Sequence, residues 1–334
     1  MKKLLVLILS FTTLAFTLTA CGSTSFDFDG AYCKTAPAAG QEATETLTYA
    51  VEVNNTTLSN TNVLQGEAKL TLDESSYYKT TFDLVNLNGD ELYCFETELK
   101  IKGAYVKGDE SYPVEDKTTS KTWFKLFRDE LAPVKTVKTV ENNTVYLGSG
   151  YKYPTIEFAY NYEVTYDNGN ATVNFNVEKD EHNALASLSG ETKYKNVDKK
   201  PYVDNELLFF VPRAYDLTKG LTKTVNSVDV AGKSLRALNL NASASDAKNV
   251  KLADGYTENG QTIPDKTEIS SVKLSIEIDD TFSGRPIEAY FATATDEKHR
   301  PTLIYTAING NIGYLTYRLK SVEYAAKYNS NIKN

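Results

Sequence analysis

The chain of 334 residues has only two histidines, three cysteines, one methionine and one tryptophan. His182 and His299 lie in charged stretches, KDEHN and DEKHR, that are typical of solvated loops. No Cys/His cluster has the spacing of a zinc site, no Ser-His-Asp set is credible, and the motifs HExxH, CxxC, GxSxG and the glycine-rich phosphate loop do not occur. We therefore expect no metal, no cofactor and no enzymatic activity. A pair of carboxylates that meets only in the folded chain is the remaining enzymatic alternative.

The chain also lacks an excess of positive charge. It has 36 Lys and Arg against 44 Asp and Glu, a formal net charge of −8. An acidic surface repels phosphate backbones and anionic lipid headgroups. This excludes nucleic acid as a partner and makes a peripheral, purely electrostatic contact with a membrane unfavourable.

One long uncharged run occurs, at the N-terminus. Residues 4–20, LLVLILSFTTLAFTLTA, follow the positive start Met1-Lys2-Lys3. The run is short and rich in Ser and Thr for a membrane-spanning helix, which needs about 20 predominantly apolar residues. It has the pattern of a secretory signal peptide, so we predict that residues 1–20 direct export.

The end of this run resembles the bacterial lipobox. Leu18-Thr19-Ala20-Cys21 matches it at all four positions, with small residues beside the thiol. The resemblance implies that Cys21 is diacylated, for example with palmitate, and becomes the new N-terminus. Two or three acyl chains anchor a protein stably, so the membrane is an expected partner, at the outer face of the cell membrane or in the periplasm and outer membrane. The alternative is an ordinary signal peptide with a chance cysteine.

The segment after the signal is small, polar and irregular. Residues 21–44 are expected to form a lipidated cysteine and flexible tether, and residues 45–328 a single β-rich domain. Outside the cytoplasm, Cys33 and Cys94 can pair as a disulfide that fixes the tether to the domain. The alternative is two unpaired thiols. A nucleophilic role is disfavoured because neither cysteine has a histidine nearby in sequence.

From residue 45 onward the hydrophobic period is two, and the 23 tyrosines are typical of strands. TLTYAVEV (46–53) alternates apolar and polar residues, and Asn88-Gly89 and the stretch 167–170 (DNGN) predict tight hairpins. The fold class predicted is mainly β: a large curved antiparallel sheet or open barrel with one or two short helices packed on it. The strands expected are 46–53, 66–72, 77–84, 91–102, the two arms around 167–170, 189–195, 221–230, 233–241, 270–279, 286–293, 301–308 and 313–323.

Two stretches interrupt the alternation and are predicted to be short helices on the sheet. In 121–131 the apolar residues recur at helical spacing before Pro133, and in 204–217 Asp204 is a candidate N-cap. The stretches 123–140 and 207–225 also resemble each other. This leaves open a duplication into related halves, about 45–145 and 146–328.

The stretch 145–325 resembles an uncharacterised family of bacterial exported proteins. The segments that carry the resemblance are DNELLFFVPRAYDLTKG, VDVAGKSLRALNL and the strand, acidic turn and strand in RPIEAYFATATDEKHRPTLIYTAINGNIGYLTYRL. The chain departs from the family where Tyr290 and Phe291 replace the usual Trp of one strand. The resemblance implies export and a mostly antiparallel β fold, and it implies no catalytic residues.

Two functions remain from this pattern. The first is a lipid-anchored, non-enzymatic protein that binds a hydrophobic or glycan-like ligand in the curved sheet; the alternative is a structural or protein-interaction component of the cell envelope. If a ligand site exists, aromatic and aliphatic side chains of the two predicted helices would line it; the alternative is that they are core. These candidates are Trp123, Phe124, Phe127, Leu208, Phe209 and Phe210. The candidates for a polar rim or a structural ion pair are Arg213, Asp296 and Arg300.

Overall fold

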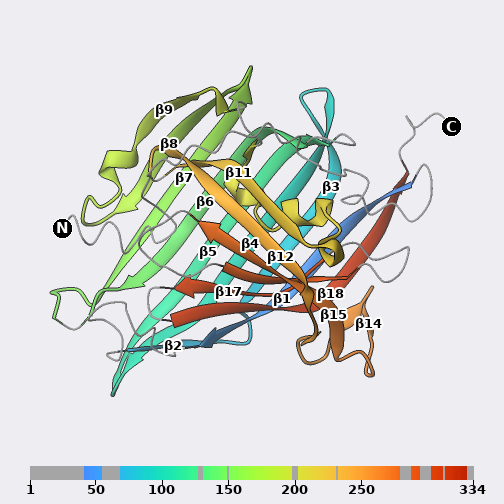
Figure 1. Ribbon diagram of the computed structural model, residues 1–334. Helices are drawn as coiled ribbons and strands as arrows, with labels where there is room; N and C mark the ends of the chain where they lie inside the picture. The colour runs from blue at the N-terminus through green and yellow to red at the C-terminus, as the bar shows by residue number, and fades with distance from the viewer. Residues whose placement is uncertain are drawn as a thin grey trace.

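The computed structural model describes residues 41–54, 68–126, 131–148, 150–197, 202–230, 232–278, 287–293, 302–310 and 313–328. These residues form one large mixed sheet of 18 strands that does not close on itself, and their only helical elements are short 3-10 turns (Figure 1). The mainly β fold expected from the alternation is confirmed. No helix in the described part of the chain is long and apolar enough to cross a membrane.

The first half of the sheet is a run of antiparallel neighbours. It starts at β1 and continues through β3 to β9 in chain order, each strand paired with the next. The short β2 pairs with one end of β4. The bounds are β1 Gln41–Asn54, β2 Lys69–Leu72, β3 Tyr77–Leu87, β4 Asp90–Lys107, β5 Glu110–Leu126, β6 Leu131–Tyr146, β7 Thr155–Asp167, β8 Asn170–Asp180 and β9 Gly190–Lys195.

The second half runs from β10 through β11, β12, β15, β16 and β17 to β18. It joins the first half because β18 pairs along the whole of β1. Two short parallel pairings, β10 with β11 and β13 with β18, make the sheet mixed. The bounds are β10 Tyr202–Val203, β11 Leu221–Asp229, β12 Ser234–Lys251, β13 Thr257–Glu258, β14 Gln261–Thr262, β15 Glu268–Ile278, β16 Ile287–Ala292, β17 Leu303–Gly310 and β18 Gly313–Tyr328.

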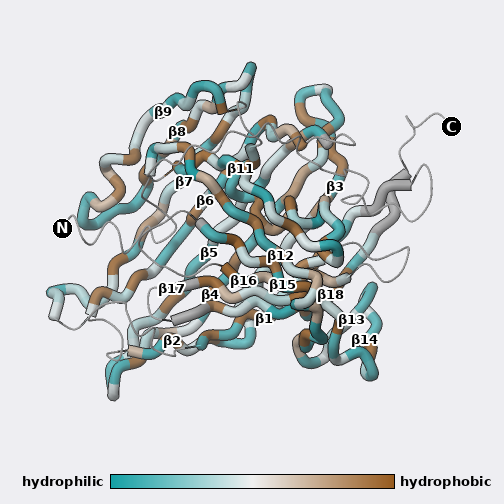
Figure 2. Tube along the Cα trace, viewed as in Figure 1, coloured by the Kyte–Doolittle hydropathy of each residue, from teal (hydrophilic) through white to brown (hydrophobic). Residues whose placement is uncertain are grey.

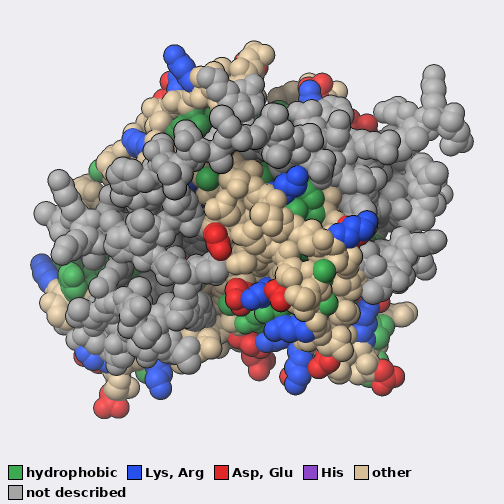
Figure 3. All heavy atoms as spheres, in the orientation of Figure 1, with side chains coloured by type: hydrophobic (Ala, Val, Ile, Leu, Met, Phe, Trp, Pro, Cys, Tyr) green, Lys and Arg blue, Asp and Glu red, His purple; other side chains and the backbone are tan. Residues whose placement is uncertain are grey.

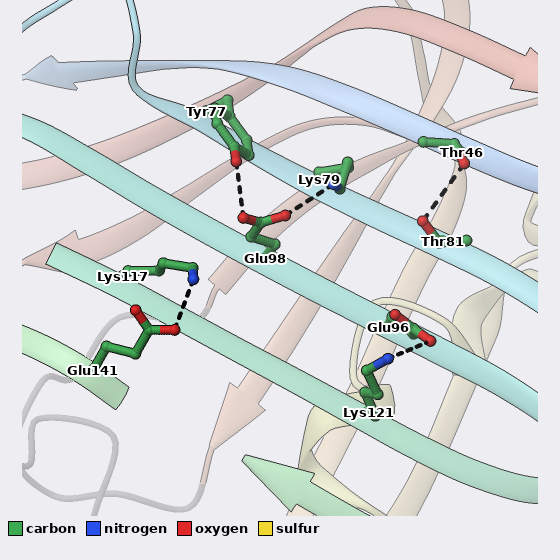
Figure 4. A network of polar contacts seen from close by, with 9 residues as sticks. All are labelled: Thr46, Tyr77, Lys79, Thr81, Glu96, Glu98, Lys117, Lys121 and Glu141. Carbon is green, nitrogen blue, oxygen red and sulfur yellow. Dashed lines mark hydrogen bonds and ion pairs between the residues drawn. The ribbon is translucent and has the colours of Figure 1, made fainter. Parts of the chain in front are cut away.

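Alternation along the strands explains the two faces of the sheet, and Figure 2 shows apolar and polar residues alternating along them. In β3, Tyr78 and Phe82 are buried, while Lys79 between them points to the other face. On that outer face Lys79 pairs with Glu98 at 2.8 Å, and the cross-strand pairs Lys117–Glu141 and Lys121–Glu96 repeat the pattern (Figure 4). In Figure 3 too, acidic and basic side chains lie beside one another rather than in blocks of one sign.

The predicted hairpins and strands are confirmed. Asn88 and Gly89 have φ of 55° and 97°, and Asn168 and Gly169 have φ of 47° and 72°, as a two-residue hairpin turn requires. Each predicted strand coincides with an observed one, although β12 extends to Lys251. The predicted strands did not include β5, β6, β10, β13 and β14.

The helix predicted over 121–131 was wrong, because residues 121–126 belong to β5. Trp123 pairs with Cys94 on β4 and with Lys135 on β6, so the backbone groups of this stretch bond to strands on both sides. Burial follows a period of two: Phe124 is fully buried and its neighbour Lys125 is exposed. Tertiary pairing overrides the helical spacing of the apolar residues here.

The second stretch does form helical turns, in three separate pieces: η3 Asn205–Leu207, η4 Val211–Ala214 and η5 Leu217–Lys219. Asp204 caps the first, as predicted, by accepting a hydrogen bond from the Glu206 backbone N–H at 2.9 Å. Pro212 lies in the first turn of η4, and Asp216 caps η5. The two stretches whose sequences resemble each other therefore fold differently, which weakens the argument for a duplication.

These 3-10 turns, with β10, form the 202–220 segment, which packs between the two halves of the sheet. Leu207, Phe210, Val211 and Leu217 belong to one buried cluster with side chains from β1, β3 and β4 and from β12 and β15–β18. A second, smaller cluster lies among β7, β8, β9 and the 3-10 turn η1 Ala186–Leu188. The 202–220 segment thus buries the inner faces of both halves at once.

Candidate functional site

Arg213 and Glu45 form a bidentate ion pair in the interior. Arg213 lies on η4 and Glu45 on β1, and their side chains are each only 2% exposed. The guanidinium donates to Oε1 at 2.5 Å and to Oε2 at 3.0 Å, and it lies 5.5 Å from the centre of the Phe210 ring. With both charges paired inside the protein, this contact holds η4 onto β1. Of the two roles considered for Arg213, the structure places it in a structural ion pair rather than at a rim.

The six candidate lining residues do not share one surface. Phe124 and Phe210 are fully buried with ring centres 5.1 Å apart, and Phe210 also contacts Phe82 and Phe95 at 5.0 and 5.3 Å. Leu208 and Phe209 pack against the same cluster. Trp123 neighbours Phe124 in β5 and points to the opposite face of the sheet. Phe127 lies outside the described residues.

A group of buried and half-buried charged side chains fastens η3 to the first half of the sheet. Glu206 accepts hydrogen bonds from Lys138 Nζ and from the Tyr162 hydroxyl, both at 2.9 Å. Asp204, which is 3% exposed, accepts from the Tyr166 hydroxyl at 2.6 Å. Lys138 lies on β6 and the two tyrosines on β7, so three elements meet at this polar cluster.

The two carboxylates of the polar cluster differ in proton affinity. Burial raises the pKa of Asp204, although its hydrogen bonds from Tyr166 and Thr136 oppose the change. Burial acts in the same direction on Glu206, but the Lys138 ammonium and the hydrogen bonds from Lys138 and Tyr162 outweigh it and hold the pKa of Glu206 below its ordinary value. Opposite shifts in neighbouring carboxyls are typical of acid–base pairs in enzymes.

The contacts of these carboxylates nevertheless have a structural explanation. Asp204 is the N-cap of η3, and Glu206 is held by an ion pair and a tyrosine hydroxyl. Each group therefore already accepts the hydrogen bonds that a buried carboxylate needs. The polar cluster, like the Arg213–Glu45 pair, positions the 202–220 segment.

A different surface is exposed on the loop between β6 and β7. Tyr151 and Tyr153 are 51% and 50% exposed and, with Leu235 at 36%, they are the large hydrophobic residues that the described part of the chain exposes. The Tyr153 ring lies 6.2 Å from His182, which is exposed in the turn after β8, and 5.0 Å from the Lys152 ammonium. We call Tyr151, Lys152, Tyr153 and His182 the tyrosine loop site.

Our sequence analysis missed this site and assigned His182 only to a solvated loop. The signal available was the stretch GSGYKYP at 148–154, in which two aromatics follow glycines and precede a proline. Such a composition marks a loop, and an aromatic residue in a loop has no sheet face to cover it.

Cys94 is a buried free thiol in the structure. Burial and the neighbouring Glu96 carboxylate raise its pKa to about 12, so the nucleophilic thiolate is disfavoured at neutral pH. Its pairing with Cys33 stays a prediction, since Cys33 lies outside the described residues. So do Cys21, Asp296 and Arg300. The described residues contain no group of three or more His, Cys, Asp or Glu side chains that could hold a metal ion.

Comparisons with models of known protein families, with curated proteins and with solved structures find no match to this chain. The resemblance of 145–325 to a family of exported proteins therefore stays a prediction. The functional argument rests on the chain's own residues.

Proposed function

We propose that this protein is a non-enzymatic binding component of the bacterial cell envelope, held at a membrane surface by lipid on Cys21 and contacting its partner through exposed side chains. Of the two functions considered from the sequence, we thus choose the interaction component of the envelope over the carrier of a ligand inside the curved sheet. The export signal and the lipobox resemblance support the location.

The observation that carries the choice is the distribution of aromatic rings. Phe124 and Phe210, which a ligand inside the sheet would have to touch, have no exposed surface. The 202–220 segment occupies the space between the two halves with its own side chains. By contrast, Tyr151 and Tyr153 expose about half of their surface on one loop. Aromatic side chains such as tyrosine are enriched at contact sites relative to the rest of a protein surface.

The anchor is tested by metabolic labelling of the full chain in a bacterial host with a palmitate analogue. We expect the label on the wild-type protein and its loss in Cys21→Ser, with the protein moving from the membrane to the soluble fraction. Cys33→Ser is the matched control and should keep the label. Labelling that survives Cys21→Ser would contradict the proposed anchor.

The surface contact is tested by native mass spectrometry of the full, membrane-extracted protein. We expect the mass of the lipidated chain alone. An additional hydrophobic molecule that stays bound, and that is lost in Phe210→Leu but kept in Tyr151→Ala, would restore the ligand-carrier function in place of ours.

A further inference from the structure

The tyrosine loop site stands on a rigid base. The backbone N–H of Leu147 donates to the Pro154 carbonyl at 2.7 Å, and that of Tyr151 to the Gly148 carbonyl at 3.2 Å, so the loop closes on itself. Leu147 and Ile156 at its two ends are 2% and 1% exposed. The backbone that carries the exposed rings is therefore fixed by its own hydrogen bonds before any partner arrives, which lowers the backbone entropy lost on binding.

The neighbouring turn that carries His182 is fixed in the same way. The Asp180 carboxylate accepts hydrogen bonds from the backbone N–H groups of Ala184 and Leu185 at 2.8 and 2.6 Å. Asn183 takes the left-handed conformation, with φ of 51°, that this turn needs. Loop and turn together present aromatic faces with hydrogen-bonding groups beside them.

Resting on the proposed function, we infer that the tyrosine loop site binds a carbohydrate chain, with sugar rings against the exposed Tyr151 and Tyr153 and with hydroxyls hydrogen-bonded by Lys152 and His182, which both lie beside Tyr153. A sugar ring has an apolar face of C–H groups and an equator of hydroxyls. A half-exposed tyrosine offers the matching apolar face, and an ammonium and an imidazole offer the hydrogen bonds. Tyr151 leaves 51% of its surface exposed for such a contact.

The size of the aromatic surface favours a sugar over a protein partner. A stable protein interface buries about 800 Å² on each partner around a central apolar core. The described chain exposes two large hydrophobic side chains here, and the third, Leu235, lies on the β11–β12 hairpin. Two tyrosine rings match the dimensions of one or two sugar units. The single Lys152 beside them gives no large field that would select a polyanion.

The test is co-sedimentation of the full, detergent-solubilised chain with insoluble peptidoglycan, chitin and cellulose, with the apparent affinity measured on each. We expect retention on at least one polymer and an affinity about tenfold weaker in the double variant Tyr151→Ala/Tyr153→Ala. Tyr151→Phe/Tyr153→Phe keeps the stacking faces and should bind within a few fold of wild type. Leu235→Ala is the matched surface control and should bind as wild type does.

Three results would overturn the inference. No retention on any polymer would do so, and so would retention that the double alanine variant does not weaken. The third is tyrosine-dependent binding to protein-free phosphatidylglycerol vesicles or to a purified envelope protein in place of the polymers. This last outcome would leave the proposed surface contact standing while removing its carbohydrate partner; loss of tyrosine dependence in every arm would remove both.

Discussion

Residues 121–131 and residues 204–217 have similar sequences but different structures. Both place an aromatic cluster, an arginine and a leucine before a Thr/Lys/Val strand, and both favour a helix by spacing. Residues 121–126 of the first lie in β5, between two long neighbours, and the second forms three 3-10 turns between the halves of the sheet. The difference is in what surrounds them, because strand partners are available on both sides of the first stretch.

Local sequence adds to this difference in the second stretch. Pro212 cannot donate a ladder hydrogen bond, and Asp204 and Asp216 offer carboxylates as caps at two turn starts. The first stretch has no proline before Pro133, so its backbone donors are free to pair in the sheet. The spacing of apolar residues alone is therefore a poor guide to whether a stretch forms a helix or a strand. Prolines that break strand pairing, together with capping residues, are a better guide.

The largest effect is expected from the ion pair that fixes the second stretch. Arg213→Ala leaves the Glu45 carboxylate buried without its partner, so the free energy of unfolding should fall by about 3–5 kcal/mol. Chemical denaturation measures this loss of unfolding free energy. Lys117→Ala removes an exposed pair with Glu141 and should change the free energy of unfolding far less. Equal losses in the two variants would contradict the buried role of Arg213.

The next largest effect is expected from the contact between Phe124 of the first stretch and Phe210 of the second. Phe210→Ala or Phe124→Ala removes a fully buried ring and should lower the free energy of unfolding by about 3–4 kcal/mol. The double variant should lose less than the sum, because the two rings share one contact. Trp123→Ala, on the opposite face of β5, should cost less. If Trp123→Ala lowered the free energy of unfolding more than Phe124→Ala, Trp123 rather than Phe124 would face the core.

The strand that contains the first stretch should respond to pH through Asp116. Burial raises the pKa of Asp116 to about 7, against the hydrogen bonds from the Thr144 hydroxyl and backbone N–H. Between about pH 4 and 7 the folded chain holds a proton that the unfolded chain has lost, so stability falls as pH rises through this window. We expect a loss of about 2–4 kcal/mol that Asp116→Asn removes.

The measurement is the denaturation midpoint at each pH from about 2 to 9, for wild type and for Asp116→Asn. The difference between the two should be flat below about pH 3 and again above about pH 8, with the change between. A constant difference across the whole range would mean that the Asp116 carboxyl titrates with an ordinary pKa in the folded protein.

The smallest effect should come from the cap of η5. Asp216 accepts hydrogen bonds from the backbone and hydroxyl of Thr218, and its side chain is 25% exposed. Asp216→Ala should lower the free energy of unfolding by about 0.5–1 kcal/mol, and Asp216→Asn, which keeps a capping oxygen, by less. If the asparagine costs as much as the alanine, the charge beside Lys219 rather than the cap is what matters.

The sequence predicted the strands wherever apolar and polar residues alternate, as in β3 and β7, and it predicted the turns at Asn88-Gly89 and Asn168-Gly169. It also marked Asp204 as a cap and Arg213 as a candidate for an ion pair. It could not predict that Glu45, 168 residues away, would be the partner of that arginine. It missed Tyr151 and Tyr153 because a tyrosine in a strand-rich chain is most simply explained as core.

The sequence alone determined the β class and the hairpin turns, because each depends on neighbours within a few residues: the period of two and the left-handed tolerance of Asn-Gly. It also predicts the N-terminal export signal, from the order of charge, apolar run and cysteine. Only the tertiary structure decided that residues 121–126 are a strand, that the 202–220 segment fills the space between the halves, and that the tyrosine loop site is exposed. Those outcomes depend on contacts between residues far apart in the chain, and such contacts leave no periodic trace in the sequence around either partner.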